Sequence, residues 1–193
     1  MSDSHLDPQS TPRKSRTAAE QHARRMTIMG ITLISIFGAL ILAVVILTIS
    51  AVKKYAAIGA CMSNEKQIAL AMLMWAEDHN KKLPSATTWA KDIMPYTKNA
   101  KILRCLADDS NAKCSYAMNA ALSGKKLDDI DDPLQTVILY ETAHPGDSPS
   151  GGIADVLRPA RHNDGNHYTF VDGHVMWFKE PPPFWPKKKS PGK

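Results

Sequence analysis

Apolar residues divide the chain into a polar start, one long apolar run and a mixed remainder. Residues 26–52 contain no charged side chain, and their apolar part, residues 28–49, reads IMGITLISIFGALILAVVILTI. A helix of this length covers a hydrocarbon core of roughly 30 Å. The polar side chains within it are Thr32, Ser35 and Thr48, whose hydroxyls can bond to the helix backbone. The run therefore predicts a transmembrane helix over residues 26–52.

A cleaved secretory signal is the alternative for an apolar run near the N-terminus. The apolar part of a signal covers about 7–15 residues and ends at a small-x-small cleavage site. Here the run is longer, and Lys53-Lys54 follow it directly. We therefore expect a retained anchor.

The spacing of apolar residues changes after the anchor. From Lys54 to Asn80 they recur every three to four positions, as on one face of a helix. They are Ile58, Met62, Ile68, Met72 and Trp75 or Ala76. A stop signal follows at Leu83-Pro84. Anchor and amphipathic segment together predict one helix of about 50 residues, half in lipid and half against a domain.

The elements after this helix are short. We expect a helix over residues 88–96, with Thr87 or Thr88 as its N-cap. Residues 135–140 contain the β-branched run TVILY, which predicts a buried strand. Residues 144–152 have the composition of a loop.

Two tight turns are expected near the C-terminus. Asp172-Gly173 lies between two apolar, aromatic-rich runs and predicts a hairpin with a two-residue type I′ turn. Asp164-Gly165 marks a second turn before it.

These elements predict four segments in an α+β chain. They are a disordered polar tail over 1–25, a transmembrane helix over 26–52, an ectodomain over 53–180 and a Pro- and Lys-rich tail without packed structure over 181–193. The ectodomain is large enough for one core, with the long helix packed on a small antiparallel sheet.

Positive charge predicts the orientation in the membrane. The tail carries Arg13, Lys14, Arg16, Arg24 and Arg25, whereas Lys53, Lys54 and Lys66 follow the anchor. Because Lys and Arg are costly to translocate, the N-terminus is expected in the cytoplasm and the ectodomain outside. The net charge is +5, but the cations do not gather among aromatic residues, so nucleic-acid binding is not expected.

The chain has three cysteines. Cys105 and Cys114 flank a short polar loop, and on the oxidising side of the membrane we expect them to form a disulfide, with Cys61 free. Their spacing does not suit a zinc knuckle.

Five potential metal ligands lie close together near the C-terminus, namely His162, Asp164, His167, Asp172 and His174. In a hairpin turning at Asp172, His167 and His174 need not share a face. Asp172 is more simply a turn former whose carboxylate accepts local N–H groups, with His162 making a structural hydrogen bond. A metal site is the alternative.

An acidic loop contains Asp128, Asp129, Asp131 and Asp132. Its spacing is not that of an EF-hand, so a solvated face is expected, with Ca²⁺ binding as the alternative. No other cofactor is expected.

The chain lacks the common catalytic motifs. It has no nucleophile elbow and no H-E-x-x-H sequence, and Glu141 and His144 have no third partner along the sequence. We therefore expect a protein that is not an enzyme.

Several blocks in a fixed order resemble a known group. Residues 61–71 read CMSNEKQIALA and look like a CxxNxKQIxxA stretch. Four later blocks follow, namely Arg104-Cys105, SYAMN at 115–119, TVILYE at 136–141, and His162 followed after nine residues by Asp172-Gly173. With the N-terminal helix, they resemble the type IV pilins and type II secretion pseudopilins, within a planctomycete and armatimonad group that carries an H-x9-DG signature in a domain of unknown function. The resemblance covers roughly residues 30–179.

The resemblance implies a pilin-like fold and processing by a prepilin peptidase, which would cut between Gly30 and Ile31. The chain departs from the motif because Ser35 stands where the family has a glutamate, and Met29 where it has a basic residue. The Arg104-Cys105 block also makes Cys61–Cys105 an alternative disulfide. His162, Asp172 and Gly173 then form the structural H-x9-DG motif.

These observations lead us to expect a structural pseudopilin-like subunit in a bacterial inner membrane. Its partners would be membrane lipid and other subunits of a type II secretion or type IV pilus-like machine. The alternative is a stand-alone membrane-anchored binding module that is neither processed nor polymerised.

Overall fold

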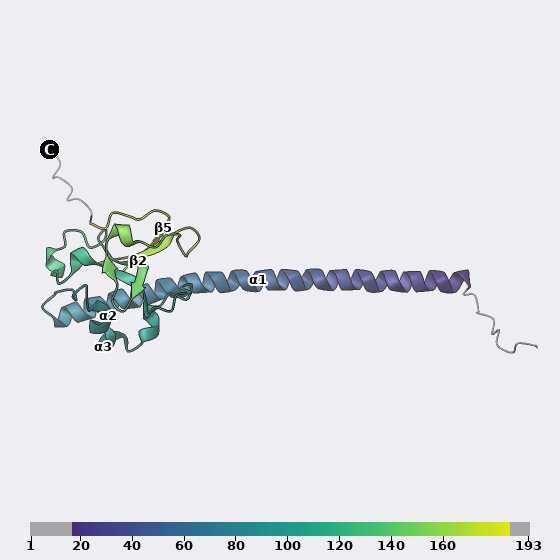
Figure 1. Ribbon diagram of the computed structural model, residues 1–193, viewed down its shortest axis with the longest axis horizontal. Coiled ribbons are helices and arrows are strands. Elements are labelled where there is room, and N and C mark those ends of the chain that lie inside the picture. The colour runs from purple at the N-terminus through teal and green to yellow at the C-terminus, as the bar shows by residue number, and fades with distance from the viewer. Residues whose placement is uncertain (1–16, 186–193) are drawn as a thin grey trace, which may run out of the picture. The chain divides into compact units, whose positions relative to one another are not determined.

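A computed structural model describes residues 17–185, so residues 1–16 and 186–193 of the two expected disordered tails lie outside it (Figure 1). Its fold class is α+β. The helices are α1 (Ala18–Asp78), α2 (Trp89–Asp92) and α3 (Met94–Thr97). Four 3₁₀ turns lie between later elements, namely η1 (Ala100–Leu103), η2 (Ala120–Leu122), η3 (Leu127–Asp129) and η4 (Ile153–Asp155). The strands are β1 (Cys114–Asn119), β2 (Val137–Gly146), β3 (Ser150–Gly151), β4 (Asn166–Phe170) and β5 (Val175–Phe178).

Helix α1 contains both predicted helical segments without a break and starts earlier than expected. Thr17 and Glu20 form a capping box, in which the Thr17 N–H donates to Glu20 Oε2 (3.1 Å) and the Glu20 N–H donates to Thr17 Oγ1 (3.4 Å). Residues 18–25 are therefore helical, and the prediction of disorder was wrong for them.

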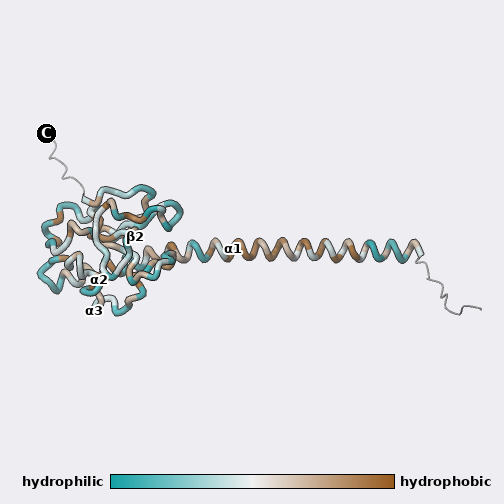
Figure 2. Tube along the Cα trace, viewed as in Figure 1, coloured by the Kyte–Doolittle hydropathy of each residue, from teal (hydrophilic) through white to brown (hydrophobic). Residues whose placement is uncertain are grey.

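The first part of α1 is apolar and exposed over residues 26–52 (Figure 2). Its most apolar window has a mean hydropathy of 2.8 and none of it is buried, so by length and composition this helix could cross a membrane. The hydroxyls of Thr32, Ser35 and Thr48 donate to carbonyls three or four residues earlier, at 2.8–2.9 Å. The polar groups of this segment are thus satisfied within the helix, as predicted.

The described part of the chain divides into two units, which meet between Ala51 and Val52. The second unit holds a five-stranded sheet of order β3-β1-β2-β4-β5. The pairings β1–β2, β2–β4 and β4–β5 are antiparallel, whereas β1–β3 is parallel. The sheet is therefore mixed and not purely antiparallel, because residues 144–152, expected as a loop, supply the end of β2 and the edge strand β3.

Two apolar clusters cover the sheet. One includes Ile68, Met72 and Ala76 of α1 together with Tyr116 and Met118 of β1. Met62, predicted on the same helix face, is instead 43% exposed. The second cluster consists of Ala117, Val137, Tyr140, Val156, Tyr168, Phe170 and Phe184.

Phe184 contradicts the prediction that the chain has no packed structure from residue 181 onward. Its side chain is buried, its ring centroid lies 4.8 Å from that of Tyr140, and its carbonyl accepts the Val137 N–H at 3.2 Å. Packing of one large aromatic side chain stabilises the fold by about 2–3 kcal/mol, enough to order the chain leading to it.

The helix predicted over residues 88–96 is split into α2 and α3, which meet at Ile93. Thr88 lies at the N-cap of α2, but its hydroxyl donates to Asp92 Oδ2 (2.7 Å) and caps no backbone N–H. Trp89 is buried, with its Nε1–H donating to the Pro149 carbonyl at 2.8 Å.

Strands β4 and β5 form the predicted hairpin, but the turn type was wrong. Phe170 accepts the Gly173 N–H and donates to the His174 carbonyl, both at 2.9 Å, so the loop has three residues with Gly173 at φ 88°. The pair of positive φ angles that marks a type I′ turn occurs at Asn163 (54°) and Asp164 (62°), one residue before the predicted Asp164-Gly165 turn.

We predict that Gly173→Val destabilises the folded domain by about 1–2 kcal/mol, because a β-branched residue is strained at positive φ. A Cβ atom there would meet no atom closer than 3.7 Å, so the cost comes from the backbone. Gly173→Asn, which tolerates this conformation, is the control and should lose less. Denaturant unfolding of the detergent-extracted chain measures both, and an unchanged midpoint for the valine variant would contradict the assignment.

Candidate functional site

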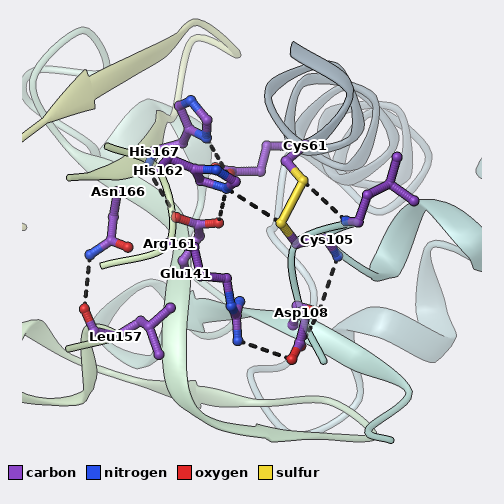
Figure 3. A network of polar contacts seen from close by, with 12 residues as sticks. Cys61, Cys105, Asp108, Glu141, Leu157, Arg161, His162, Asn166 and His167 are labelled. Atoms are coloured by element: carbon purple, nitrogen blue, oxygen red, sulfur yellow. Dashed lines mark hydrogen bonds and ion pairs between the residues drawn. A yellow bond between two sulfur atoms is a disulfide. The ribbon is translucent and has the colours of Figure 1, made fainter. Parts of the chain in front are cut away.

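Four ionisable side chains are buried together where α1 meets the sheet. Glu65 comes from α1, Glu141 from β2, His167 from β4 and His162 from the turn before β4. Their exposed fractions are 0%, 0%, 2% and 0%. Figure 3 shows Glu141, His162 and His167 beside the Cys61–Cys105 disulfide.

Local structure explains this convergence. Glu65 lies one turn after Cys61 on the buried face of α1. Glu141 follows Tyr140, which pairs with Tyr168 of β4, and this register places Glu141 beside His167. The type I′ turn brings His162 back alongside Gly165, with reciprocal backbone hydrogen bonds of 3.1 and 3.2 Å.

Each carboxylate has one oxygen held by a protein donor. Glu65 Oε2 accepts from the Thr169 hydroxyl at 2.9 Å, and Glu141 Oε2 accepts from the His167 backbone N–H at 3.3 Å. The other Glu141 oxygen lies 2.7 Å from His162 Nε2. Glu65 Oε1 lies 3.8 Å from His167 Nδ1.

The cluster retains unpaired polar atoms. Among the described residues, Glu65 Oε1, His162 Nδ1 and His167 Nδ1 are buried without a hydrogen-bond partner. Burial, followed by the charge of Glu141, raises the pKa of Glu65 well above its ordinary value of 4.5. Burial also lowers the pKa of His167. Without a counter-charge, the site therefore favours the neutral forms of both groups.

The structure corrects the predicted disulfide. Cys61 is bonded to Cys105, with a Cα–Cα distance of 5.0 Å, and Cys114 is a buried free thiol. Cys105 lies after η1 and faces α1, whereas the Cys114 thiol at the start of β1 donates to the Tyr116 carbonyl at 3.2 Å. The pairing is the alternative that the family-like Arg104-Cys105 block suggested.

An ion pair supports the loop that carries Cys105. Arg161 lies 3.2 Å from Asp108 Oδ1, while Ser115 donates to Asp108 Oδ2 at 2.5 Å and the Cys105 N–H donates to Ser115 Oγ at 3.1 Å. Burial opposes ionisation of Asp108, but hydrogen bonds from Ser115 and Ser110 and the charge of Arg161 hold its pKa below the ordinary value of 3.8.

The histidine- and aspartate-rich segment is only partly brought together. His162 and His167 join the buried cluster, whereas Asp164 lies in the exposed turn. Asp172 accepts the His174 N–H at 3.1 Å and lies 2.6 Å from His174 Nδ1, so its predicted role as a local turn former is confirmed.

The acidic loop lies apart from this cluster. Asp128 and Asp129 are exposed in η3, and Asp131 is exposed after it. Asp132 accepts from the Gln135 backbone at 3.2 Å and from its side chain at 2.8 Å. The described residues that could jointly hold a metal ion do not include these aspartates, and Ca²⁺ binding there stays a prediction.

Sequence reasoning missed Glu65 and the pairing of Glu141 with His162. Glu65 follows the buried Cys61 by four positions and precedes the buried Ile68 by three, a spacing that places it on the apolar face. This signal was available, but the contact between Glu141 and His162 depends on strand pairing.

No protein-family model, no curated protein and no solved structure matches the chain.

We predict that Cys61→Ser or Cys105→Ser lowers the stability of the oxidised protein by about 3–4 kcal/mol, because the bridge closes a loop with a sequence separation of 44. Cys114→Ala is the control, since it removes a buried thiol and leaves the bridge intact. Denaturant midpoints and non-reducing peptide mapping test this. A peptide joining Cys105 to Cys114 would overturn the assignment.

We predict that Asp108→Asn destabilises the fold by about 2–3 kcal/mol at neutral pH, because it leaves Arg161 without its counter-ion. The native carboxylate stabilises the fold above pH 3.8, and this contribution is lost as pH falls through its lower folded-state pKa. The difference between variant and wild type should therefore shrink near pH 2–3. The exposed Asp109→Asn is the matched control, and a pH-independent loss in Asp108→Asn would contradict the ion-pair role.

Proposed function

We propose that the chain is a structural, pseudopilin-like subunit of a bacterial envelope machine of the type II secretion or type IV pilus kind. Helix α1 anchors it in the inner membrane with the N-terminus in the cytoplasm. Its work is assembly, by lateral packing of anchor helices and docking of ectodomains, without catalysis.

The exposed apolar part of α1 carries this proposal. Large side chains at many positions around the helix are exposed, such as Ile34 (73%), Phe37 (64%) and Leu47 (70%). Water would oppose exposure of such a surface, whereas lipid or neighbouring apolar helices accept it. The membrane alone would satisfy the anchor, and the family-like motifs add the expectation of neighbouring subunits.

The disulfide supports an extracytoplasmic ectodomain. Cys61 and Cys105 lie in the unit after the anchor, and structural disulfides persist in oxidising compartments. This agrees with the orientation that the excess of Arg and Lys before the anchor predicts.

The geometry at the processing motif favours a subunit that is uncleaved or poorly cleaved. Gly30 and Ile31 lie inside α1, where their peptide bond is held in helical conformation. Ser35 has an uncharged hydroxyl, which donates to the Ile31 carbonyl at 2.8 Å, so no carboxylate is offered to a neighbour's amino group at this position. Such a subunit suits a position at which no carboxylate–ammonium pair is required, such as a filament tip.

A stand-alone binding module is the second candidate. The described surface has a cavity of about 650 Å³ lined by Ala90, Met94 and Leu103, with Lys91 and Lys101 among its polar neighbours. A module of this kind would need the anchor but no contact between anchors.

A photo-crosslinker at Leu40, which is 62% exposed, separates the two candidates in host membranes. An assembly subunit should give a discrete adduct with a second chain that has its own prepilin-type helix. The matched position Leu134, 63% exposed on the ectodomain, is the comparison for contacts outside the membrane. Lipid adducts alone at Leu40 would contradict assembly through the anchor.

We predict that Ser35→Glu lowers the membrane-inserted fraction, because an uncompensated carboxyl deep in the anchor costs about 2–3 kcal/mol on insertion scales. Ser35→Gln is the size-matched control and should insert better.

We also expect the wild-type protein to be uncleaved, so its intact mass should include residues 1–30. A mature chain that begins at Ile31 with a methylated amino group, and gains in assembly from Ser35→Glu, would contradict the uncleaved form.

A further inference from the structure

We propose that Glu65, Glu141, His162 and His167 form a divalent metal centre that joins α1 to strands β2 and β4. The inference is independent of the assembly role, since it concerns only the interior of the ectodomain. It rests on the donor atoms, their burial and the balance of charge.

Three of the four donors are close enough to share one ion. One ligand atom each from Glu141, His162 and His167 lie within 4.8 Å of one another. Glu65 lies outside this group of three, but its Oε1 is 3.8 Å from His167 Nδ1, so it would complete the set as a fourth donor after a small shift. The rings of His162 and His167 also lie together, with centroids 4.7 Å apart.

Two of the three unsatisfied atoms of the cluster are ones that an ion would use. Glu65 Oε1 and His167 Nδ1 are completely buried without a hydrogen-bond partner, and such groups cost roughly 1–3 kcal/mol each when left unpaired. Glu141 Oε1 and His162 Nε2 now satisfy each other, and a metal would replace the proton between them. A divalent ion thus supplies one partner to all four side chains.

Charge leads to the same conclusion. In the form that binds a metal, with both carboxylates ionised and both imidazoles neutral, the four side chains carry a net charge of −2, which is costly to bury without a cation. Arg161 is directed to Asp108 at 3.2 Å and does not neutralise the pair. One divalent cation makes the site neutral.

The surrounding contacts resemble the outer sphere of a metal site. Thr169 and the His167 backbone N–H each hold the second oxygen of one carboxylate, which orients the first oxygen toward the imidazoles. Trp177 Nε1 donates to the His162 carbonyl at 2.7 Å and fixes the backbone behind that ring.

The donor set indicates the class of metal. Two nitrogen and two oxygen donors favour zinc or another first-row divalent ion over Ca²⁺, which prefers six to eight oxygens. The sulfur atoms of Cys61 and Cys105 lie beside His162 but are joined to each other, so they are not thiolate ligands. We therefore assign a structural N₂O₂ site without sulfur.

Because the site is buried, the ion must enter during folding. The detergent-extracted full chain is refolded with its disulfide intact in the presence of Zn²⁺, Co²⁺ or EDTA, dialysed, and analysed for metal content. We expect one zinc per chain, a higher thermal midpoint than in EDTA, and Co²⁺ absorption bands without a thiolate charge-transfer band. Metal-free wild-type protein that refolds equally well in zinc and in EDTA would overturn the proposal.

Variants identify the ligands. Glu65→Gln and His167→Gln should each weaken zinc binding at least tenfold, whereas the exposed His144→Gln should leave it unchanged. Formation of the Cys61–Cys105 bridge and near-ultraviolet circular dichroism report whether each variant is folded. If a ligand variant does not fold, competition of wild-type protein with a chelator still measures the affinity. If folded Glu65→Gln and His167→Gln bind zinc as tightly as the wild type, or if Co²⁺ shows a thiolate charge-transfer band, the assignment is overturned.

Discussion

The burial of two glutamates between α1 and the sheet constrains the rest of the domain that follows residue 51. Glu65 and Glu141 have no exposed surface, and an ion removed from water costs several kcal/mol unless nearby groups compensate it. Groups on β4 and on the turn before it supply this compensation. Thr169 and the His167 backbone contact the carboxylates, and the type I′ turn before β4 brings His162 to Glu141.

The disulfide lies one helical turn from the same glutamate. Cys61 and Glu65 occupy the same face of α1, so the covalent bond to Cys105 and the polar contacts of Glu65 restrain the same rotation of the helix. Asp108 and Arg161 then connect the Cys105 loop to the chain next to His162. Covalent, ionic and hydrogen-bonded restraints therefore converge on one short part of α1.

The other half of α1 is constrained in a simpler way. Residues 26–52 need only an apolar environment, because their few hydroxyls bond within the helix. The two halves of α1 therefore require different surroundings. In the proposed assembly the apolar half contacts lipid and neighbouring anchors, and the other half carries the packed domain.

The sequence by itself determined the long helix, its apolar segment, the α+β class and the strand at residues 135–140. These features depend on local periodicity and composition, which act over one element at a time. It also determined the positive φ of Gly173, since Asp-Gly between two apolar runs has few alternatives. It did not determine the loop length of that hairpin, which depends on the register of β4 against β5.

Tertiary structure decided the contacts between residues far apart in the chain. Cys105 bonds to Cys61 and not to the nearer Cys114, because the fold places Cys105 against α1. Phe184 is ordered because it packs against Tyr140 in the second apolar cluster, although its local sequence resembles a disordered tail. The buried glutamate–histidine cluster arises in the same way, since strand pairing and helix packing bring its four members together and local sequence preference cannot specify that meeting.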